Sequence, residues 1–122
     1  MAFRNFTPSN EPVRPSEILL SEANGYRSRD VAIAGGAFAA GQILGRLTSN
    51  GLLVAWSPTA DTGAENAVAV AEDASTGIGA EVVVYARDCE VKSSALVTPA
   101  DATALQIAAA LASLAALGIV AR

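Results

Sequence analysis

The side chains of this chain that could carry out chemistry are few. The sequence contains no histidine and a single cysteine, Cys89. The Ser/His/Asp and Cys/His nucleophilic systems both use a histidine as general base, so both are excluded. Structural zinc sites need Cys and His ligands that the sequence does not supply. We therefore expect no catalytic residues, no metal and no cofactor.

Carboxylate pairs are the remaining candidates for chemistry. Asp61 and Glu65, or Glu72 and Asp73, could act as the acid and base of a hydrolase. Asp61 and Glu65 could also bind calcium, although their spacing matches no EF-hand loop. Both pairs are expected at loop or strand edges, where charged residues usually keep a protein soluble. With so few titratable groups, the chain is predicted not to be an enzyme.

Composition indicates one small domain with a thin core. The chain has 122 residues, of which 52% are hydrophobic but only 5% aromatic, and alanine supplies much of the hydrophobic share. A core of small side chains often gains stability by oligomerisation. The formal charge is −4, and the basic residues are scattered from Arg4 to Arg122. Direct binding of nucleic acid, which needs clustered Lys and Arg, is not expected.

The first sixteen residues are expected to form an irregular arm, followed by a single domain over residues 17–122. Pro8, Pro12 and Pro15 interrupt residues 1–16 and prevent a packed helix or strand there. Fully extended, this arm could reach about 50 Å. Its two aromatic residues, Phe3 and Phe6, are either stray exposed side chains or anchors for a partner surface.

Short strands separated by turns are predicted from residue 17 onward. Asn50-Gly51 between two apolar segments is a strong hairpin signal. Cys89–Lys92 alternates apolar and polar residues, as a half-buried strand does. The expected strands span residues 17–22, 31–33, 42–47, 52–56, 67–71, 82–85 and 89–92, with a last one possible at 119–121. The fold class predicted is α+β: a small β-rich domain with one C-terminal helix.

The helix is expected to begin at Thr98-Pro99, with Thr98 as N-cap and proline at the first helical position. Gly118 can close it in the left-handed conformation, which gives a helix of about eighteen residues. Residues 102–121 carry no charge, which is the length of a membrane span. Because alanine contributes little to membrane insertion, a soluble helix is favoured and a membrane-associated protein is the alternative.

Glycines in the first half of the chain are interpreted as turn residues. Residues 35–41 resemble a phosphate-binding loop only in glycine content, because the Lys-Ser/Thr ending is missing. Gly41 and Gly45 have the spacing of a membrane dimer motif, but Gln42 and Arg46 argue against it.

An ordered series of segments from about Phe38 to Ile119 resembles the lambda-type head decoration protein family of tailed phages. The series is Phe38–Leu47 with its Gly-Gln-Ile-Leu-Gly core, Asn50-Gly51, Asp61-Thr62-Gly63, Ala67–Asp73, Val82–Tyr85, Glu90-Val91 and Leu111 to Leu117-Gly118-Ile119. Each segment alone is unspecific, and the order at this chain length is what carries the resemblance. Arg87-Asp88-Cys89 departs from it, because many relatives have a small residue there.

The resemblance implies a structural protein of the virion. Its relatives bind as homotrimers at three-fold positions on the outer surface of the expanded capsid, assembled in the host cytoplasm, and hold the shell against the pressure of packaged DNA. The partner implied is the major capsid protein, with no direct nucleic-acid contact and no membrane. The arm pairs with capsid strands in that family, so the capsid-binding residues expected here are Phe3, Arg4, Asn5, Phe6 and Thr7. The alternatives are a tail or head-completion protein and a non-viral ligand-binding domain.

Overall fold

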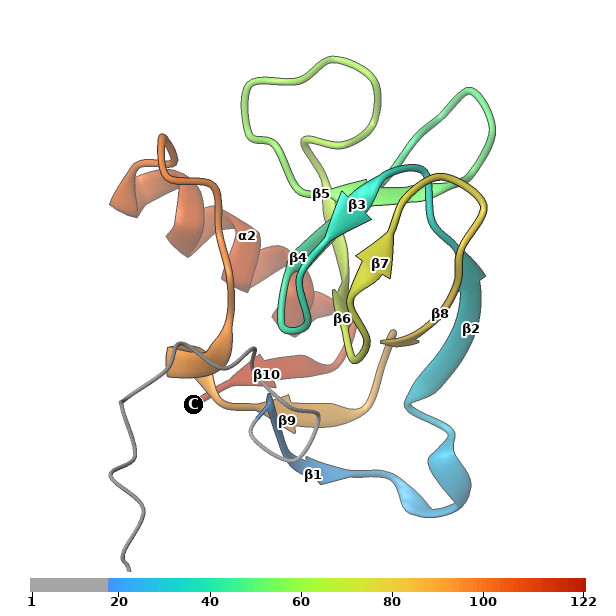
Figure 1. The fold of residues 1–122 in the computed structure, drawn as a ribbon. Helices are drawn as coiled ribbons and strands as arrows, with labels where there is room; N and C mark the ends of the chain where they lie inside the picture. Colours follow the sequence, from blue (N-terminus) through green and yellow to red (C-terminus); the bar gives the residue numbers. More distant parts are fainter. Residues whose placement is uncertain (1–17) are drawn as a thin grey trace, which may run out of the picture.

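The computed structural model describes residues 18–122 and shows a β-rich α+β fold (Figure 1). Within these residues ten short strands form three sheets, and a helix follows near the C-terminus. The elements are β1 (Leu19–Glu22), η1 (Asn24–Tyr26), β2 (Arg29–Ile33), β3 (Ala37–Phe38), β4 (Ile43–Arg46), β5 (Leu53–Ala55), β6 (Ala67–Ala71), β7 (Ser75–Thr76), β8 (Glu81–Tyr85), β9 (Cys89–Val91), η2 (Ser93–Ala95), α2 (Ala104–Ala116) and β10 (Ile119–Ala121). The predicted fold class is confirmed.

The largest sheet is antiparallel and curls toward a barrel. Its strand order is β2-β8-β6-β4-β5. A parallel bridge between Ala34 and Leu53, with Gly35 N–H donating to the Leu53 carbonyl at 2.6 Å, joins the two outer strands at one end. The side chains inside this curl are mostly small, and they form a buried cluster of Ala34, Phe38, Leu44, Leu53, Ala69, Ala71, Val82 and Val84.

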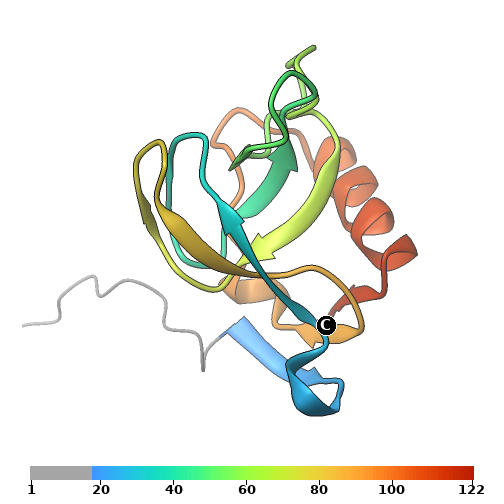
Figure 2. The ribbon, with the colours of Figure 1, turned by 90° about the vertical axis from the view of Figure 1, so that its right-hand side faces the viewer.

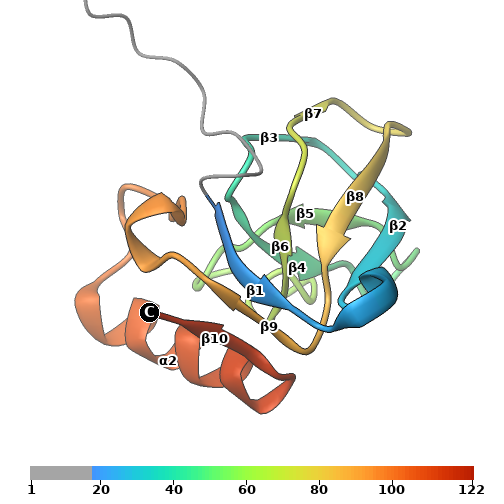
Figure 3. The same ribbon diagram turned by 90° about the horizontal axis from the view of Figure 1, so that it is seen from below.

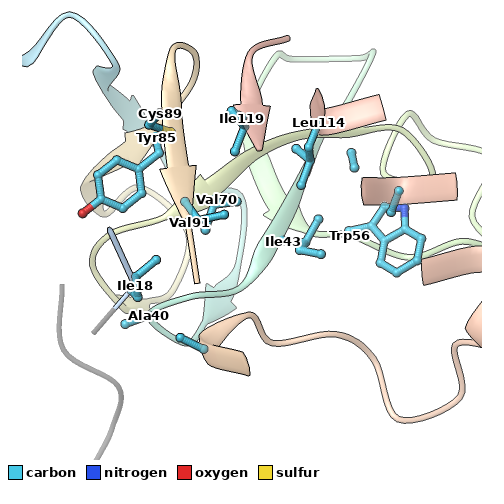
Figure 4. Packing of buried hydrophobic residues seen from close by; sticks show 13 residues of the cluster. Ile18, Ala40, Ile43, Trp56, Val70, Tyr85, Cys89, Val91, Leu114 and Ile119 are labelled. Atoms are coloured by element: carbon cyan, nitrogen blue, oxygen red, sulfur yellow. The ribbon is translucent and has the colours of Figure 1, made fainter. Parts of the chain in front are cut away.

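A second layer covers the other face of this sheet. It consists of the three-stranded sheet β1-β9-β10, in which β10 runs parallel to β9, together with α2 (Figure 3). The second buried cluster lies between the layers, where Ile43 and Val70 of the large sheet meet Leu114 of α2 and Ile119 of β10 (Figure 4). Strands β4 and β6 are therefore buried on both faces, which explains their nearly continuous apolar sequences.

Most strands predicted from the sequence are present. The Asn50-Gly51 hairpin is confirmed, because β4 and β5 pair around it with Gly51 at a φ of 74°. The last strand at 119–121 is also confirmed. The two-residue strands β3 and β7 were not predicted, since a pair this short has no periodicity to detect.

The predicted start of the helix is wrong. The helix begins at Ala104 with Thr103 as N-cap, and it has 13 residues rather than about eighteen. Thr103 and Gln106 form a capping box: Thr103 Oγ1 accepts from the Gln106 N–H, and Gln106 Oε1 accepts from the Thr103 N–H. This reciprocal pair satisfies two backbone donors, whereas a Thr98 cap would satisfy only one. Gly118, with a φ of 88°, closes the helix as predicted.

Gly45 lies within strand β4, as the expected strand at 42–47 placed it, and its interpretation as a turn residue is wrong. The predicted arm, residues 1–16, and Glu17 lie outside the described residues. Within residues 18–122, α2 falls short of the length and apolarity that a helix needs to cross a membrane.

Candidate functional site

The predicted capsid-binding residues, Phe3 to Thr7, lie outside the residues that the structure describes, so their role stays a prediction. What the structure does show is the point from which the arm leaves and the surfaces around it. Ile18, the first described residue, is fully buried. Its carbonyl accepts a hydrogen bond from the Lys92 N–H at 2.7 Å, and β1 pairs with β9 directly after it. The first described residue is therefore fixed to the sheet β1-β9-β10.

A cluster of charged side chains joins strand β1, which follows the arm in the chain, to the large sheet. Arg29 of β2 binds Glu22 at the end of β1 through two nitrogens, at 2.7 and 3.0 Å. Its Nη1 also donates to both carboxylate oxygens of Glu72, at 3.0 and 3.1 Å. The Ser28 hydroxyl donates to Glu22 at 2.5 Å, and the Arg29 guanidinium lies 5.5 Å from the centre of the Tyr85 ring. We call Glu22, Arg29 and Glu72 the arm-root clamp.

The two carboxylates of the arm-root clamp respond differently to their surroundings. Hydrogen bonds from Arg29 and Ser28 lower the pKa of Glu22 below its usual value. Burial outweighs the attraction of Arg29 at Glu72 and raises the pKa of that carboxyl group. The pKa of Arg29 is raised, chiefly by its hydrogen bond to Glu22, so the guanidinium stays charged. Glu22 is thus the carboxylate that the clamp stabilises in its ionised form.

Of the four carboxylates considered for chemistry, Glu65 and Glu72 bind within the fold. Glu65 accepts the Gly63 N–H on both oxygens, at 2.8 and 3.0 Å, and so holds its own loop. Glu72 belongs to the arm-root clamp. Asp61 and Asp73 are exposed. Within residues 18–122 no three His, Cys, Asp or Glu side chains gather in a way that could hold a metal ion.

Cys89 is buried in the layer between the sheets. Burial raises the pKa of its thiol to about 11, with smaller contributions from Glu22 and Asp88. A thiol with a raised pKa is protonated at neutral pH and is a poor nucleophile. Cys89 therefore serves as a small core residue.

The outer face of α2 is exposed and carries no charge. Ala110 and Leu114 face the core, with Ile107 and Leu111 partly buried beside them. The exposed positions of the helix are mostly alanine, and Leu105 is 81% exposed. Beside the helix lies a groove of about 280 Å³, lined by Trp56, Pro58, Glu65, Asn66, Gln106, Ala109, Ala110 and Ser113. Solvent-facing helices usually carry charged residues on the exposed side, so this face is suited to contact with protein.

A second open surface lies along β2, at one edge of the large sheet. The side chains of Val31 and Ile33 project outward and are 64% and 43% exposed, and Ile78, in the turn before β8, is 80% exposed. A groove of about 340 Å³ runs between β2 and the β4–β5 hairpin. We call it the β2 groove.

Neither surface nor the clamp was identified from the sequence. The uncharged stretch at 102–121 was a signal for the α2 face, although it was interpreted as a soluble helix, with a membrane span as the alternative, and not as a contact surface. Glu72 is 43 residues from Arg29, and no local pattern could have joined them. The β2 groove depends on which strands are neighbours, which periodicity does not encode.

The described residues form a small β-rich fold with exposed apolar faces, and two of the carboxylates considered for chemistry, Glu65 and Glu72, bind within that fold. The chain belongs to the family of bacteriophage lambda head decoration protein D, whose family model matches residues 8–119. No curated protein matches the chain. The resemblance drawn from the sequence is thereby confirmed, and with it a structural role in the phage capsid and a location in the virion.

Proposed function

We propose that this protein binds as a homotrimer to the outer surface of the expanded phage capsid, at its three-fold positions, and stabilises the shell against internal DNA pressure. The major capsid protein is its partner, and it catalyses no reaction. The family match over residues 8–119 is the observation that carries the proposal. In this proposal residues 17–122 form the decoration domain and residues 1–16 form the capsid-binding arm.

The arm, with Phe3, Arg4, Asn5, Phe6 and Thr7 as its contact residues, holds the protein on the shell. Ordering sixteen residues costs on the order of 16–32 kcal/mol, at about 1–2 kcal/mol per residue. A capsid surface that offers strand hydrogen bonds and apolar pockets can offset this cost. Three arms on one trimer bind together, so arms that are weak individually hold firmly as a set.

The outer face of α2 is the surface we assign to contact between subunits. No charged group has to lose its hydration there, and the cores of protein interfaces are depleted of charged residues. A helix of 13 residues is about 20 Å long. A stable interface needs about 800 Å² from each partner, so the adjoining groove beside Trp56 has to contribute as well.

Co-sedimentation with phage heads that lack this protein tests the proposal. The full chain is mixed with expanded and with unexpanded heads in parallel, and its native mass is measured alone. Binding to expanded heads only, by a trimer, is the expected result. A hexamer that binds neither shell would point to a tail component and overturn the proposal.

A further inference from the structure

The sequence contains two Asn-Gly pairs, and the structure places both in exposed turns. Asn24-Gly25 lies in η1, between β1 and β2, and Asn50-Gly51 lies in the hairpin of β4 and β5, at the opposite end of the fold (Figure 2). Gly25 and Gly51 have nearly the same φ, 76° and 74°. A Cβ atom built on either glycine would meet nothing within 4 Å. Backbone shape and crowding therefore do not distinguish the two turns, whereas hydrogen bonds do.

Asparagine followed by glycine can lose ammonia through its own backbone, and asparagine is among the chemically labile residues of proteins. The glycine nitrogen gives its proton to solvent and attacks the asparagine Cγ. This bond forms as the bond between Cγ and Nδ2 breaks, and ammonia leaves after Nδ2 takes a proton from solvent. Water then opens the succinimide ring: cleavage of the bond to Cγ gives aspartate, and cleavage of the bond to the backbone carbonyl carbon gives isoaspartate. The reaction requires a glycine N–H that can lose its proton and an asparagine side chain that can turn toward it.

Hydrogen bonds oppose both requirements at Asn50-Gly51. The Gly51 N–H donates to the Leu47 carbonyl at 2.9 Å. The Asn50 Oδ1 atom accepts the Leu52 N–H at 3.1 Å. The attacking nitrogen has to break the first bond before it can lose its proton, and the side chain has to break the second bond before it can turn. Both bonds are lost only when the hairpin turn opens.

No such bonds hold Asn24-Gly25. The hydrogen bonds of a 3-10 helix begin at its third residue, so the Gly25 N–H, at the second residue of η1, has no acceptor within that helix. Within residues 18–122, no other acceptor binds this N–H, and the Asn24 side chain forms no hydrogen bond. Both groups that react are therefore free in the folded protein.

A neighbouring guanidinium activates the same peptide group. The Arg27 Nε donates to the carbonyl oxygen of Asn24 at 3.1 Å. This carbonyl and the Gly25 nitrogen belong to one peptide group. A charge-assisted hydrogen bond to the oxygen draws electron density from the nitrogen, which then loses its proton more readily. The guanidinium also stabilises the negative charge that spreads over the peptide group when the proton leaves.

We propose that Asn24 is the residue at which the folded protein deamidates, and that the hairpin turn protects Asn50. Water is the co-reactant, and the products are ammonia and a chain with aspartate or isoaspartate at position 24. The site follows from contacts within one chain, so it is independent of the proposed capsid function.

The modified position adjoins the arm-root clamp. Asn24 follows Glu22 by two residues, and Arg29, which binds Glu22 at 2.7 Å, lies on the other side of η1 in the chain. Isoaspartate adds one carbon atom to the main chain between these two partners. Either product also brings a second carboxylate close to Glu22 in the sequence. Deamidation at this position thus alters the connection whose two ends the clamp holds together.

Peptide mapping by mass spectrometry on the full chain tests the proposal. The protein is incubated at mildly alkaline pH, folded and in parallel unfolded in urea, and the deamidated peptides that contain position 24 or position 50 are quantified over time. In the folded protein we expect position 24 to react at least about tenfold faster than position 50, which corresponds to about 1.4 kcal/mol for opening the protected turn. In urea the two rates should be similar, because glycine follows both asparagines. Equal rates in the folded protein, or a faster rate at position 50, would overturn the proposal.

Arg27→Gln tests the activating contact, because it removes the guanidinium and keeps an amide that can donate to the same carbonyl. We expect the rate at position 24 to fall severalfold and the rate at position 50, which also rises if a variant opens the fold, to stay unchanged. Arg122→Gln is the matched control: it removes one positive charge beside Val91, at the end of β9, and should change neither rate. An unchanged rate at position 24 in Arg27→Gln, or an equal fall in Arg122→Gln, would overturn the role assigned to Arg27.

Discussion

Gly45 shows how a single residue sets the packing of the large sheet. A Cβ atom at this position would lie 2.5 Å from the carbonyl oxygen of Ala64 and 2.7 Å from its Cα, both of them backbone atoms. Strand β4 and the loop before β6 can therefore approach this closely only without a side chain here. This gives a physical reason for the second glycine of the Gly-Gln-Ile-Leu-Gly segment.

Gly45→Ala should lower the free energy of unfolding by about 1–3 kcal/mol, the usual cost of overpacking. Gly36→Ala is the matched control, because a Cβ there meets nothing within 4 Å. Urea denaturation of both variants measures the difference. Equal stability of the two would show that the Ala64 loop moves aside freely.

The arm-root clamp makes stability depend on pH through Glu22. A carboxyl group with a lowered pKa in the folded state stabilises the fold above its unfolded pKa, near 4.5, and loses that effect as the pH falls through the folded value. Glu72 works in the opposite sense, because its raised pKa means that the folded state binds its proton more tightly. As the pH falls, Glu72 therefore binds its proton before Glu22 does, and the loss of stability in acid comes from the protonation of Glu22.

We expect Glu22→Gln to lower the free energy of unfolding by about 1–3 kcal/mol at pH 7, with the difference from wild type shrinking below pH 4.5. Urea denaturation from pH 3 to pH 7 measures this. Glu72→Gln is the comparison, and it should leave the loss of stability in acid in place. A constant gap between Glu22→Gln and wild type across this range would contradict the assignment.

At the scale of elements, the start of α2 shows how two similar local signals compete. Thr98-Pro99 and Thr103 with Gln106 are both plausible helix starts in sequence. Thr103→Ala should cost about 1 kcal/mol, because the Gln106 N–H loses its acceptor. Thr98→Ala is the control, since Thr98 lies before the helix, and it should change little. Thermal unfolding followed by circular dichroism measures both, and a larger effect at Thr98 would contradict the capping box.

The same elements show what a single sequence can predict. Alternation and turn residues located β4, β5, β6, β8 and β9, because these signals are local. The order β2-β8-β6-β4-β5 was not predictable, because each neighbour in it depends on packing between segments far apart in the chain. The arm-root clamp and the β2 groove arise from that order, so they were missed together. The family was recognisable because its segments keep their order, although none is specific alone.

At the scale of the whole molecule, α2 and β2 lie on different sides of the fold (Figure 1). Contact between subunits through α2, as proposed, would leave β2 exposed. Leu105→Lys, which places a charge on the exposed face of α2, should convert the proposed trimer to a monomer with an unchanged fold. Native mass spectrometry measures the change. Ser49→Lys, at the exposed tip of the β4–β5 hairpin, is the control that should remain a trimer, and a trimeric Leu105→Lys would move the subunit contact elsewhere.

In the proposed function, attachment to the shell depends on three arms acting together. Removing both phenyl rings of an arm, by Phe3→Ala with Phe6→Ala, takes away its large apolar side chains other than Met1 and Val13. Burial of a phenylalanine side chain is worth about 1.5–3 kcal/mol, so each arm should lose roughly 3–6 kcal/mol if both rings are buried on the capsid. Because the three arms bind as a set, the loss multiplies, and binding to expanded heads should fall below detection in co-sedimentation. A trimer that carries Leu20→Ala, an exposed side chain in β1, should bind as wild type. Unchanged affinity of the double variant would show that the hold on the capsid comes from the folded part of the trimer instead of the arm.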